Sequence, residues 1–330
     1  MKNQAELQRS NLNRGYTIAV ISAVILSTTA ILIRHLTQTY NIPPLVLAFW
    51  RDGFVAIALL PILGLAYPLL LHVNRQHLRY LSAYGLILAI FNAVWTLSVA
   101  LNGAAISTVL VYCSTGFTAL LGWWLLHESL DWVKLGAVVV CMGGGILVSE
   151  ALDLRAWGTN TIGIITGIFS GLGYAAYTLM GRSASQRGLN PWTTVFYTFG
   201  FAALFLLLFN LCLGGLIPGT VSQPVDFLWL RTSWVGWAIL FLLAAGPTLT
   251  GFGLYNLSLS YLPSSVGNLI LTLEPVFTVI IARLLLGETL KGIQIAGSIM
   301  ILGGVAFLRI SEEILGNSNP NLEKNVYKKN

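Results

Sequence analysis

Charged residues and cysteines are scarce in this sequence. Only 9% of the 330 residues are Asp, Glu, Lys or Arg, and 56% are hydrophobic, whereas a typical soluble domain has about 25% charged residues. A soluble chain of this composition lacks the polar side chains needed to cover its surface, but a chain surrounded by lipid does not need them. The composition therefore excludes an ordinary soluble domain and predicts an integral membrane protein.

The three cysteines, Cys113, Cys141 and Cys212, all lie within apolar stretches. They are too few and too scattered for a disulfide framework or a zinc site, so we interpret them as small apolar side chains. His127 and Glu128 also lack the second histidine that a zinc-binding motif of this type requires. The sequence thus predicts neither a metal site nor a cofactor.

Long apolar runs fill most of the chain, and a helix needs about 20 apolar residues to cross the hydrocarbon core of a bilayer. Ten such runs occur, at residues 16–33, 45–66, 80–101, 104–126, 132–149, 161–181, 192–214, 235–257, 264–286 and 291–309. Their connections are mostly short and carry helix breakers, such as Asn102-Gly103 and Leu262-Pro263. The first run is long for a signal peptide and has a later copy, so we expect it to be retained. We therefore predict an all-α membrane protein with ten transmembrane helices and a polar, disordered cytoplasmic tail over residues 310–330.

The net charge of +6 would suit a nucleic-acid partner, but the positions of the basic residues favour a membrane topology instead. Two of the 18 Lys and Arg residues lie within spans, and with the N-terminus inside, 12 of the rest fall on the inner side. The four on the outer side are Arg34, Arg155, Arg231 and Lys291. Because cytoplasmic loops are enriched in Lys and Arg, we predict that both termini are cytoplasmic, with residues 1–14 as an N-terminal segment. The N-terminus does not resemble a transit peptide, so we expect a multi-pass protein of the plasma (inner) membrane, with no nucleic-acid partner.

The chain contains an internal duplication. Residues 101–147 align without a gap with residues 261–307, and the opening spans align at an offset of 148. The aligned pairs include Phe117 and Phe277, Glu128 and Glu288, Gly144 and Gly304, and Pro43 and Pro191. Each half, 15–149 and 161–309, holds five spans. Because five is odd, the second half starts on the opposite side of the membrane, which predicts two inverted five-helix repeats with a solute site near the midplane between them.

Each half ends in a helix, a Leu-x-Glu-x-Leu segment and a glycine-rich helix, at residues 126–130 and 286–290. Together with Leu273-Glu274-Pro275-Val276-Phe277 and Arg51, these features resemble the EamA-type branch of the drug/metabolite transporter superfamily. The resemblance covers residues 15–309. It implies ten helices in an inverted-repeat bundle and efflux of small metabolites such as amino acids, with proton exchange as one energy source. Thr115 stands where the second half has Pro275, and His127 replaces the usual glycine, so an identical hinge in the first half is not expected.

Four ionisable residues lie inside predicted spans: Arg51, Asp52, Glu274 and Arg283. Such groups are costly in a membrane and are functional candidates by default; we assign Glu274, Arg51 and Asp52 to coupling or gating. Neighbouring residues on a helix point about 100° apart, so Arg51 and Asp52 are not expected to pair. A carboxyl group in a low dielectric favours its neutral form, so Glu274 is a candidate for proton exchange; a fixed hydrogen bond or ion pair between helices is the equal alternative. Pro275 predicts a local break in the helix there.

Several amphipathic side chains within spans are candidates to line a solute pocket, because such pockets are mostly apolar with a few convergent polar groups. The substrate-binding candidates are Trp95, Tyr112, Tyr174, Tyr177, Tyr255 and Asn268. Simple helix packing is the alternative for each of them. Glu128 and Glu288 each precede a helix and are predicted to cap it. Gly163, Gly167 and Gly171 predict a flat packing face on the sixth span.

The function that fits these features is a secondary carrier that exports a small organic solute by alternating access, so the predicted partners are that solute and the lipid bilayer. A membrane-embedded enzyme is the first alternative, but the sequence has no set of catalytic residues and its loops are too short for a catalytic domain. We therefore predict that the protein is not an enzyme. A channel or a non-transporting membrane scaffold is the other alternative. The sequence leaves open the substrate, the direction of transport, the coupling ion and the oligomeric state.

Overall fold

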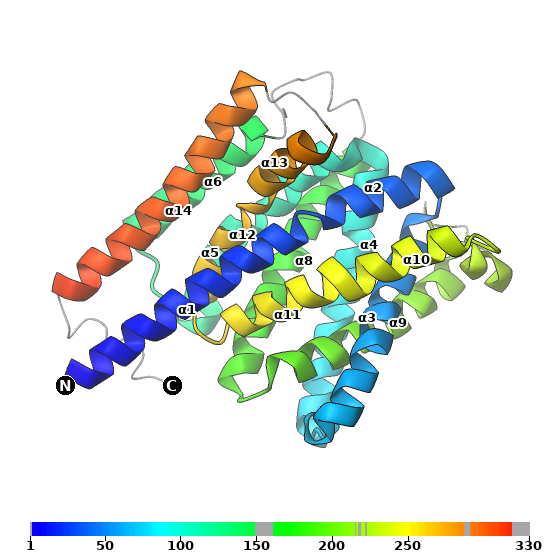
Figure 1. The fold of residues 1–330 in the computed structure, drawn as a ribbon, viewed down its shortest axis with the longest axis horizontal. Helices are drawn as coiled ribbons and strands as arrows, with labels where there is room; N and C mark the ends of the chain where they lie inside the picture. The colour runs from blue at the N-terminus through cyan, green and yellow to red at the C-terminus, as the bar shows by residue number, and fades with distance from the viewer. Residues whose placement is uncertain are drawn as a thin grey trace.

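The computed structural model describes residues 2–148, 161–214, 216, 219–221, 223–286 and 291–318 (Figure 1). Every regular element in these ranges is a helix, and seven helices among them are long and apolar enough to cross a membrane. The prediction of an all-helical membrane protein is therefore confirmed. Glu288 and the side chain of Arg283 lie outside the described residues.

The helices follow the chain in two similar series. The first half contains α1 (Lys2–Leu26), α2 (Thr29–Tyr40), α3 (Pro44–Ala66), the 3-10 helix η1 (Pro68–Leu71), α4 (Arg75–Tyr112), α5 (Ser114–Leu126) and α6 (Trp132–Val148). The second half contains α8 (Thr161–Gln186), α9 (Pro191–Leu213), the 3-10 helix η2 (Pro224–Leu228), α10 (Trp234–Leu243), the π-helical segment η3 (Ala244–Thr248), α11 (Leu249–Ser258), α12 (Ser264–Leu271), α13 (Glu274–Leu286) and α14 (Gly292–Ser318). The predicted runs fall on helical backbone, but several helices are broken or merged.

Polar side chains at the helix starts fix several of these boundaries. Asn74 accepts a hydrogen bond from the backbone N–H of His77 at 2.8 Å and begins α4. Asn190 does the same for Trp192 at 2.9 Å, with Pro191 as the first residue of α9. Such caps satisfy the N–H groups that have no partner within the helix.

The sequence predicts that the helix ends at Asn102-Gly103. This is wrong, because the backbone of α4 stays helical through these two residues. Its axis nevertheless bends sharply. The hydroxyls of Ser98 and Ser107 lie 3.0 Å apart, whereas nine residues of a straight helix span about 13.5 Å. The chain therefore reverses direction close to the predicted position, and the third and fourth predicted runs form the two arms of the bend.

Two helices are interrupted at aligned positions. The N–H of Cys113 donates to Leu110 O at 3.2 Å, and that of Leu273, 160 residues later, donates to Ile270 O at 3.0 Å. These shorter-range bonds satisfy backbone groups where the α-helical pattern stops. The first half thus has a break at the aligned position although it has no proline there. The break spans one residue in the first half and two in the second, so the two hinges are similar but not identical. A third break, at Ser27 and Thr28, separates α1 from α2 within the first predicted run.

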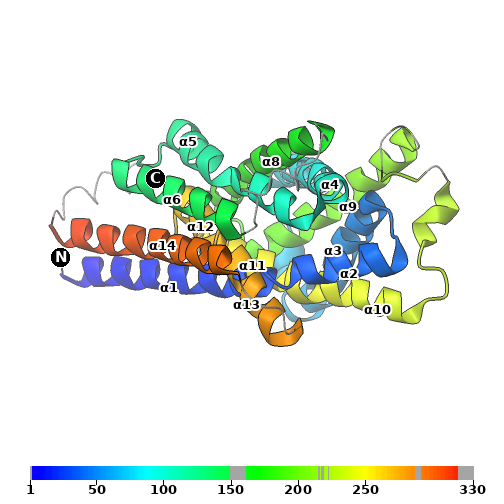
Figure 2. The same ribbon diagram turned by 90° about the horizontal axis from the view of Figure 1, so that it is seen from above.

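The last helices of the two halves, α6 and α14, lie side by side in both views (Figure 1 and Figure 2). A Cβ atom placed on Gly144 would lie 2.7 Å from Ile301 Cγ1. Gly304 aligns with Gly144, and its Cβ would lie 2.7 Å from the Sγ of Cys141, which aligns with Ile301. As α6 advances from residue 141 to 144, its partner moves back from 304 to 301. The two helices are therefore antiparallel and related by an approximate two-fold axis, as inverted copies require.

Other helix pairs repeat the same relation. Phe91 on α4 stacks on Tyr174 of α8 with ring centroids 5.0 Å apart. The residues aligned with these are Gly251 on α11 and Leu26 on α1, and they are in contact as well. Gly167 and Gly171 on α8 pack closely against Leu110 on α4, where any side chain would clash. The flat glycine face predicted for this helix is therefore present at these two positions.

The first part of α1 and the later part of α14 lie together at one end of the molecule. Arg309 on α14 donates a hydrogen bond to Asn13 on α1, and its guanidinium lies 4.7 Å from the centroid of the Tyr16 ring. Arg14 lies 5.3 Å from the ring of Tyr261, in the turn between α11 and α12. The predicted disordered tail is wrong over residues 310–318, because α14 continues to Ser318.

Large apolar side chains are exposed around the outside of the bundle. Leu65 is 88% exposed, Trp132 87% and Leu284 77%. A soluble monomer does not present apolar surface on this scale, so the exposed faces are those that lipid would cover.

The glutamate of the first Leu-x-Glu-x-Leu segment lies at a helix start, but not the predicted one. Glu128 reaches the N-terminus of α12 in the other half. The start of α6 is instead capped by Asp131, whose carboxylate accepts from the N–H of Lys134 at 2.8 Å. Glu128 thus caps a helix, as predicted, but the helix is α12 and not the predicted α6.

Candidate functional site

A buried hydrogen-bond network joins α4, α8 and α11. The hydroxyl of Tyr84 donates to Asn256 Oδ1 at 3.3 Å, and Asn256 Nδ2 donates to the hydroxyl of Tyr177 at 2.7 Å. The two tyrosines are fully buried, and Asn256 nearly so. Buried polar groups of this kind are held because each finds a partner, so the network fixes three helices from two halves against one another.

A second set of bonds continues from α8 to α12 and α5. The hydroxyls of Thr178 and Tyr255 lie 2.9 Å apart, and Asn268 Nδ2 donates to Thr178 Oγ1 at 3.2 Å. Ser114, the first residue of α5, donates to Asn268 Oδ1 at 3.2 Å. Asn268 therefore connects the broken span of the second half to that of the first half. It lies one turn before the interruption at Leu273, and its partner Ser114 directly follows the interruption at Cys113.

Aromatic rings fill the space between these polar groups. Tyr174 stacks on Phe91, and its ring centroid lies 6.4 Å from that of Tyr177 and 6.2 Å from that of Tyr255. Tyr84 and Tyr177 are 4.9 Å apart. The result is an aromatic cluster with hydroxyl and amide groups at its edge, the composition expected of an organic-solute site.

Glu274 is the first residue of α13, directly after the break in the second half's broken span. Its Oε2 accepts a hydrogen bond from the hydroxyl of Tyr112 at 3.0 Å, and Tyr112 is the last residue of α4, next to the matching break. Glu274 as a whole residue is half-buried. One turn further along, Thr278 donates to Ser27 O, at the break between α1 and α2, at 3.1 Å. Three helix interruptions therefore meet around one carboxyl group at a helix N-terminus, where the dipole favours negative charge.

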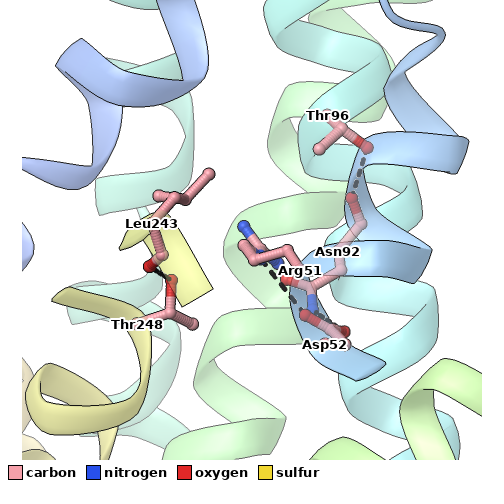
Figure 3. Close-up of polar contacts among 6 residues, drawn as sticks. All are labelled: Arg51, Asp52, Asn92, Thr96, Leu243 and Thr248. Atoms are coloured by element: carbon pink, nitrogen blue, oxygen red, sulfur yellow. Dashed lines mark hydrogen bonds and ion pairs between the residues drawn. The ribbon is translucent and has the colours of Figure 1, made fainter. Parts of the chain in front are cut away.

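Arg51 and Asp52 on α3 form an ion pair, contrary to the prediction that they would not. The Nε of Arg51 lies 3.1 Å from Asp52 Oδ1, and Asn92 on α4 donates to Asp52 Oδ2 at 2.6 Å (Figure 3). Although the two Cβ atoms point apart, the three methylene groups of Arg51 let its guanidinium curl back. Both residues are almost fully buried, so the charge pair has to be satisfied from within the protein.

The free part of Arg51 faces the π-helical segment η3. Figure 3 shows its guanidinium on the side of α3 toward Leu243 and Thr248. Arg51 Nη2 is buried and has no hydrogen-bond partner among the described residues. Pro247 has no N–H to give to Leu243 O, and the hydroxyl of Thr248 takes its place at 2.8 Å.

The structure therefore brings together five of the six residues predicted to line a pocket: Tyr112, Tyr174, Tyr177, Tyr255 and Asn268. Glu274 lies beside them through Tyr112. Trp95 lies apart, partly buried between the central core and a second apolar cluster formed by α2, α3, α10 and their neighbours. Arg51 and Asp52 form a separate group, joined to α4 through Asn92.

The predicted site residues omit four members of the network: Tyr84, Asn256, Thr178 and Ser114. A threonine or serine in an apolar helix gives no signal of its own, because its hydroxyl can bond the preceding turn of the same helix. Ser114 carried one available signal, since it aligns with Glu274 at the offset of 160. Within the described part of the chain, no three His, Cys, Asp or Glu side chains gather closely enough to hold a metal ion.

Comparison with known proteins agrees with this architecture. The model of the EamA-like transporter family matches residues 13–150 and again residues 161–310. A transporter of Archaeoglobus fulgidus described as uncharacterised is 27% identical over 295 residues, covering 88% of this chain and 94% of that one. An uncharacterised transporter of Synechocystis is 28% identical over 239 residues, covering 72% and 68%. A probable amino-acid metabolite efflux pump of Salmonella typhimurium is 26% identical over 271 residues, covering 81% and 85%.

The fold has also been observed in a solved crystal structure. That structure covers 91% of this chain and 98% of its own, with a TM-score of 0.72 and 15% sequence identity. At this identity the likeness establishes the arrangement of the helices and nothing about the solute.

Proposed function

Because the chain belongs to the EamA-like transporter family, we propose that it is a secondary transporter that exports a small organic solute by alternating access. The observation that carries the proposal is the meeting of interrupted helices from both halves at a buried polar and aromatic cluster. Broken helices leave backbone groups and helix ends free to bind a solute, which is why they mark the site in inverted-repeat carriers.

We place the chain in the plasma (inner) membrane with ten crossings and both termini cytoplasmic. Supporting this orientation, Arg14, Arg309 and Arg182 share one end of the bundle: Arg182 donates to Leu259 O at 2.8 Å, beside the turn that Arg14 contacts. Basic residues gather on the cytoplasmic side of membrane proteins.

Amino acids and related metabolites are the proposed substrates. The similarity to the Salmonella typhimurium protein, a probable amino-acid metabolite efflux pump, supports this class. The cluster supports it on chemical grounds, because its aromatic rings suit an apolar side chain while Asn268 and Tyr255 offer polar contacts. Tyr112, Tyr174 and Tyr177 complete the proposed lining.

Glu274 is the proposed coupling residue. Among the described residues, one hydrogen bond, from Tyr112, holds its carboxyl group and no basic side chain pairs with it, so the group is available to exchange a proton or to contact a cationic group on the solute. Arg51 and Asp52, which are paired with each other, are proposed to act in gating through η3 and not in proton exchange.

The test is uptake into sealed proteoliposomes of the purified protein, with labelled amino acids and small metabolites, with and without a proton gradient. We expect saturable uptake that the gradient accelerates. In Glu274→Gln, uptake should fall to the same rate with and without the gradient, while the protein still exchanges solute. Tyr112→Phe should weaken the response to the gradient, and Tyr80→Phe should not, because the hydroxyl of Tyr80 bonds Met180 O outside the cluster.

Two results would count against the proposal. Gradient-driven uptake that is unchanged in Glu274→Gln would remove Glu274 from coupling. A correctly folded protein that moves no solute of the panel, in either direction, would favour a scaffold over a carrier.

A further inference from the structure

Glu128 binds the N-terminus of α12 with four hydrogen bonds. Its Oε1 accepts from the backbone N–H of Ser264 at 2.6 Å and from the Ser264 hydroxyl at 2.8 Å. Its Oε2 accepts from the N–H of Ser265 at 3.2 Å and from the Ser265 hydroxyl at 2.9 Å. Hydrogen bonds to an ionised carboxylate are the strong ones, and here every one of them crosses from the first half to the second.

The end of α5 is built to present this carboxylate. His127 adopts a left-handed conformation, with φ of 54°, and the N–H of Glu128 donates to Gly122 O at 3.1 Å. A left-handed residue followed by a backbone hydrogen bond to the last turn is a common helix C-terminal cap. Gly122 also leaves the necessary space, because a Cβ there would lie 2.9 Å from Glu128 Oε2 and 3.0 Å from Ser264 Oγ.

The contact between Glu128 and α12 lies between the candidate solute site and one end of the bundle. Asn268 is one helical turn after Ser264 on α12, and Ser114, which bonds Asn268, is on α5. The helices α5 and α12 therefore meet twice, at Glu128 near the end of the bundle and at Asn268 within it. The end concerned is the one that holds residues 13–16 and Arg309, because Gly15 contacts Leu262 just before α12. A path that enters between α5 and α12 from that end would require the two helices to part at Glu128.

The internal duplication makes the two ends of the molecule unequal. At the offset of 160, Glu128 aligns with Glu288, but Ser264 and Ser265 align with Ala104 and Ala105. Glu288 lies outside the described residues. By sequence alone, the aligned positions at the opposite end offer no hydroxyl donors.

We propose that Glu128, Ser264 and Ser265 form a latch between the halves that closes the end of the bundle where residues 13–16 and Arg309 lie. Because the aligned sequence positions carry no hydroxyl groups, we expect this end to be the more firmly closed of the two. The inference rests on the proposed alternating access, since it assigns the state that the carrier prefers without solute: closed at the latch end.

The test measures the width of the latch end by electron spin resonance on the full-length protein in lipid nanodiscs. Spin labels are placed at Trp124→Cys on the exposed face of α5 and Ser260→Cys before α12, in a chain whose three native cysteines are replaced by alanine. Ser264→Ala/Ser265→Ala should raise the ratio of long to short distances about tenfold, because two hydrogen bonds to a charged acceptor are lost. Glu128→Gln should shift the ratio in the same direction.

Ser298→Ala is the matched control, because its hydroxyl bonds Gln294 O within α14 and takes no part in the latch; it should leave the distances unchanged. The converse variant, Ala104→Ser/Ala105→Ser, adds donors at the opposite end and should also raise the population of long distances at the latch end. The double serine variant keeps the test valid if Glu128→Gln does not fold.

Distances that are the same in Ser264→Ala/Ser265→Ala and in the unmodified latch would overturn the proposal. Distances unchanged by Ala104→Ser/Ala105→Ser would overturn the inequality of the two ends. The measurement needs no transport, so a latch that opens in a protein that moves no solute would support the latch and contradict the carrier function. A protein that transports solute but whose spin-label distances do not change in Ser264→Ala/Ser265→Ala would support the carrier function and contradict the latch.

Discussion

The three residues proposed for coupling or gating occur in two different settings. Arg51 and Asp52 neutralise each other, and Asn92 completes the coordination of the carboxylate. Glu274 has one hydrogen bond, from a tyrosine, and no basic partner among the described residues. A neutral pair is suited to holding α3 against α4, whereas a carboxyl group without a basic partner is suited to gaining and losing a proton.

Removing one member of the Arg51 and Asp52 pair should cost more than removing both. Asp52→Asn leaves a buried guanidinium without its counter-charge, and we expect it to lower the free energy of unfolding by about 3–5 kcal/mol. Adding Arg51→Met should recover a large part of that loss, because no buried charge remains. Denaturant or thermal unfolding in detergent checks this through a double-mutant cycle. Additive losses would show that the two side chains do not depend on each other.

Several helices of this fold are interrupted, and the interruptions lie close to the candidate functional groups. Three interruptions, at Ser27, Cys113 and Leu273, lie near the candidate site, and a π-helical segment at Pro247 lies opposite Arg51. Proline explains only two of these four places. At Cys113 the aligned backbone bonds show that packing in the repeated fold imposes the break without it, since helical propensity alone is routinely overridden by tertiary contacts.

The π-helical segment gives an element-scale prediction. Thr248→Val removes the hydroxyl that donates to Leu243 O, and the loss of this buried hydrogen bond should lower the free energy of unfolding by about 1 kcal/mol. Pro247→Ala supplies an N–H for the same carbonyl, so the double variant Pro247→Ala/Thr248→Val should be more stable than Thr248→Val. Unfolding in detergent measures both. If the proline substitution brings no recovery, the carbonyl is not the cause of the loss.

At the scale of the whole molecule, the two halves are antiparallel copies held together along α6 and α14. Their close approach depends on Gly144 and Gly304, because any side chain there would meet the facing helix. Small residues let helix backbones approach closely in a membrane, where apolar surface alone does not drive association. The latch at Glu128 and the network at Asn256 then connect the same halves by polar contacts.

The inverted relation can be tested with a cross-link. A Cβ at Gly304 would lie 2.7 Å from the sulfur of Cys141, a separation suited to a disulfide. Gly304→Cys should therefore join the halves under mild oxidation, so that they stay linked on a denaturing gel after cleavage at a protease site inserted between them. Gly303→Cys is the control, since its Cβ would have no neighbour within 4 Å. Equal cross-linking of the two variants would contradict the antiparallel register.

The membrane class, the helical fold and the duplication could all be predicted before the fold was known, because they follow from composition and from the recurrence of apolar runs and aligned motifs. The same reasoning selected Tyr112, Tyr174, Tyr177, Tyr255 and Asn268, which the fold gathers in one cluster. The pairing of individual groups, in contrast, is visible only in the folded molecule. The ion pair of Arg51 depends on a side-chain rotamer, and the partner of Glu128 lies 136 residues away. Contacts of this kind are set by how two folded halves pack, and a pattern read along one chain does not contain that information.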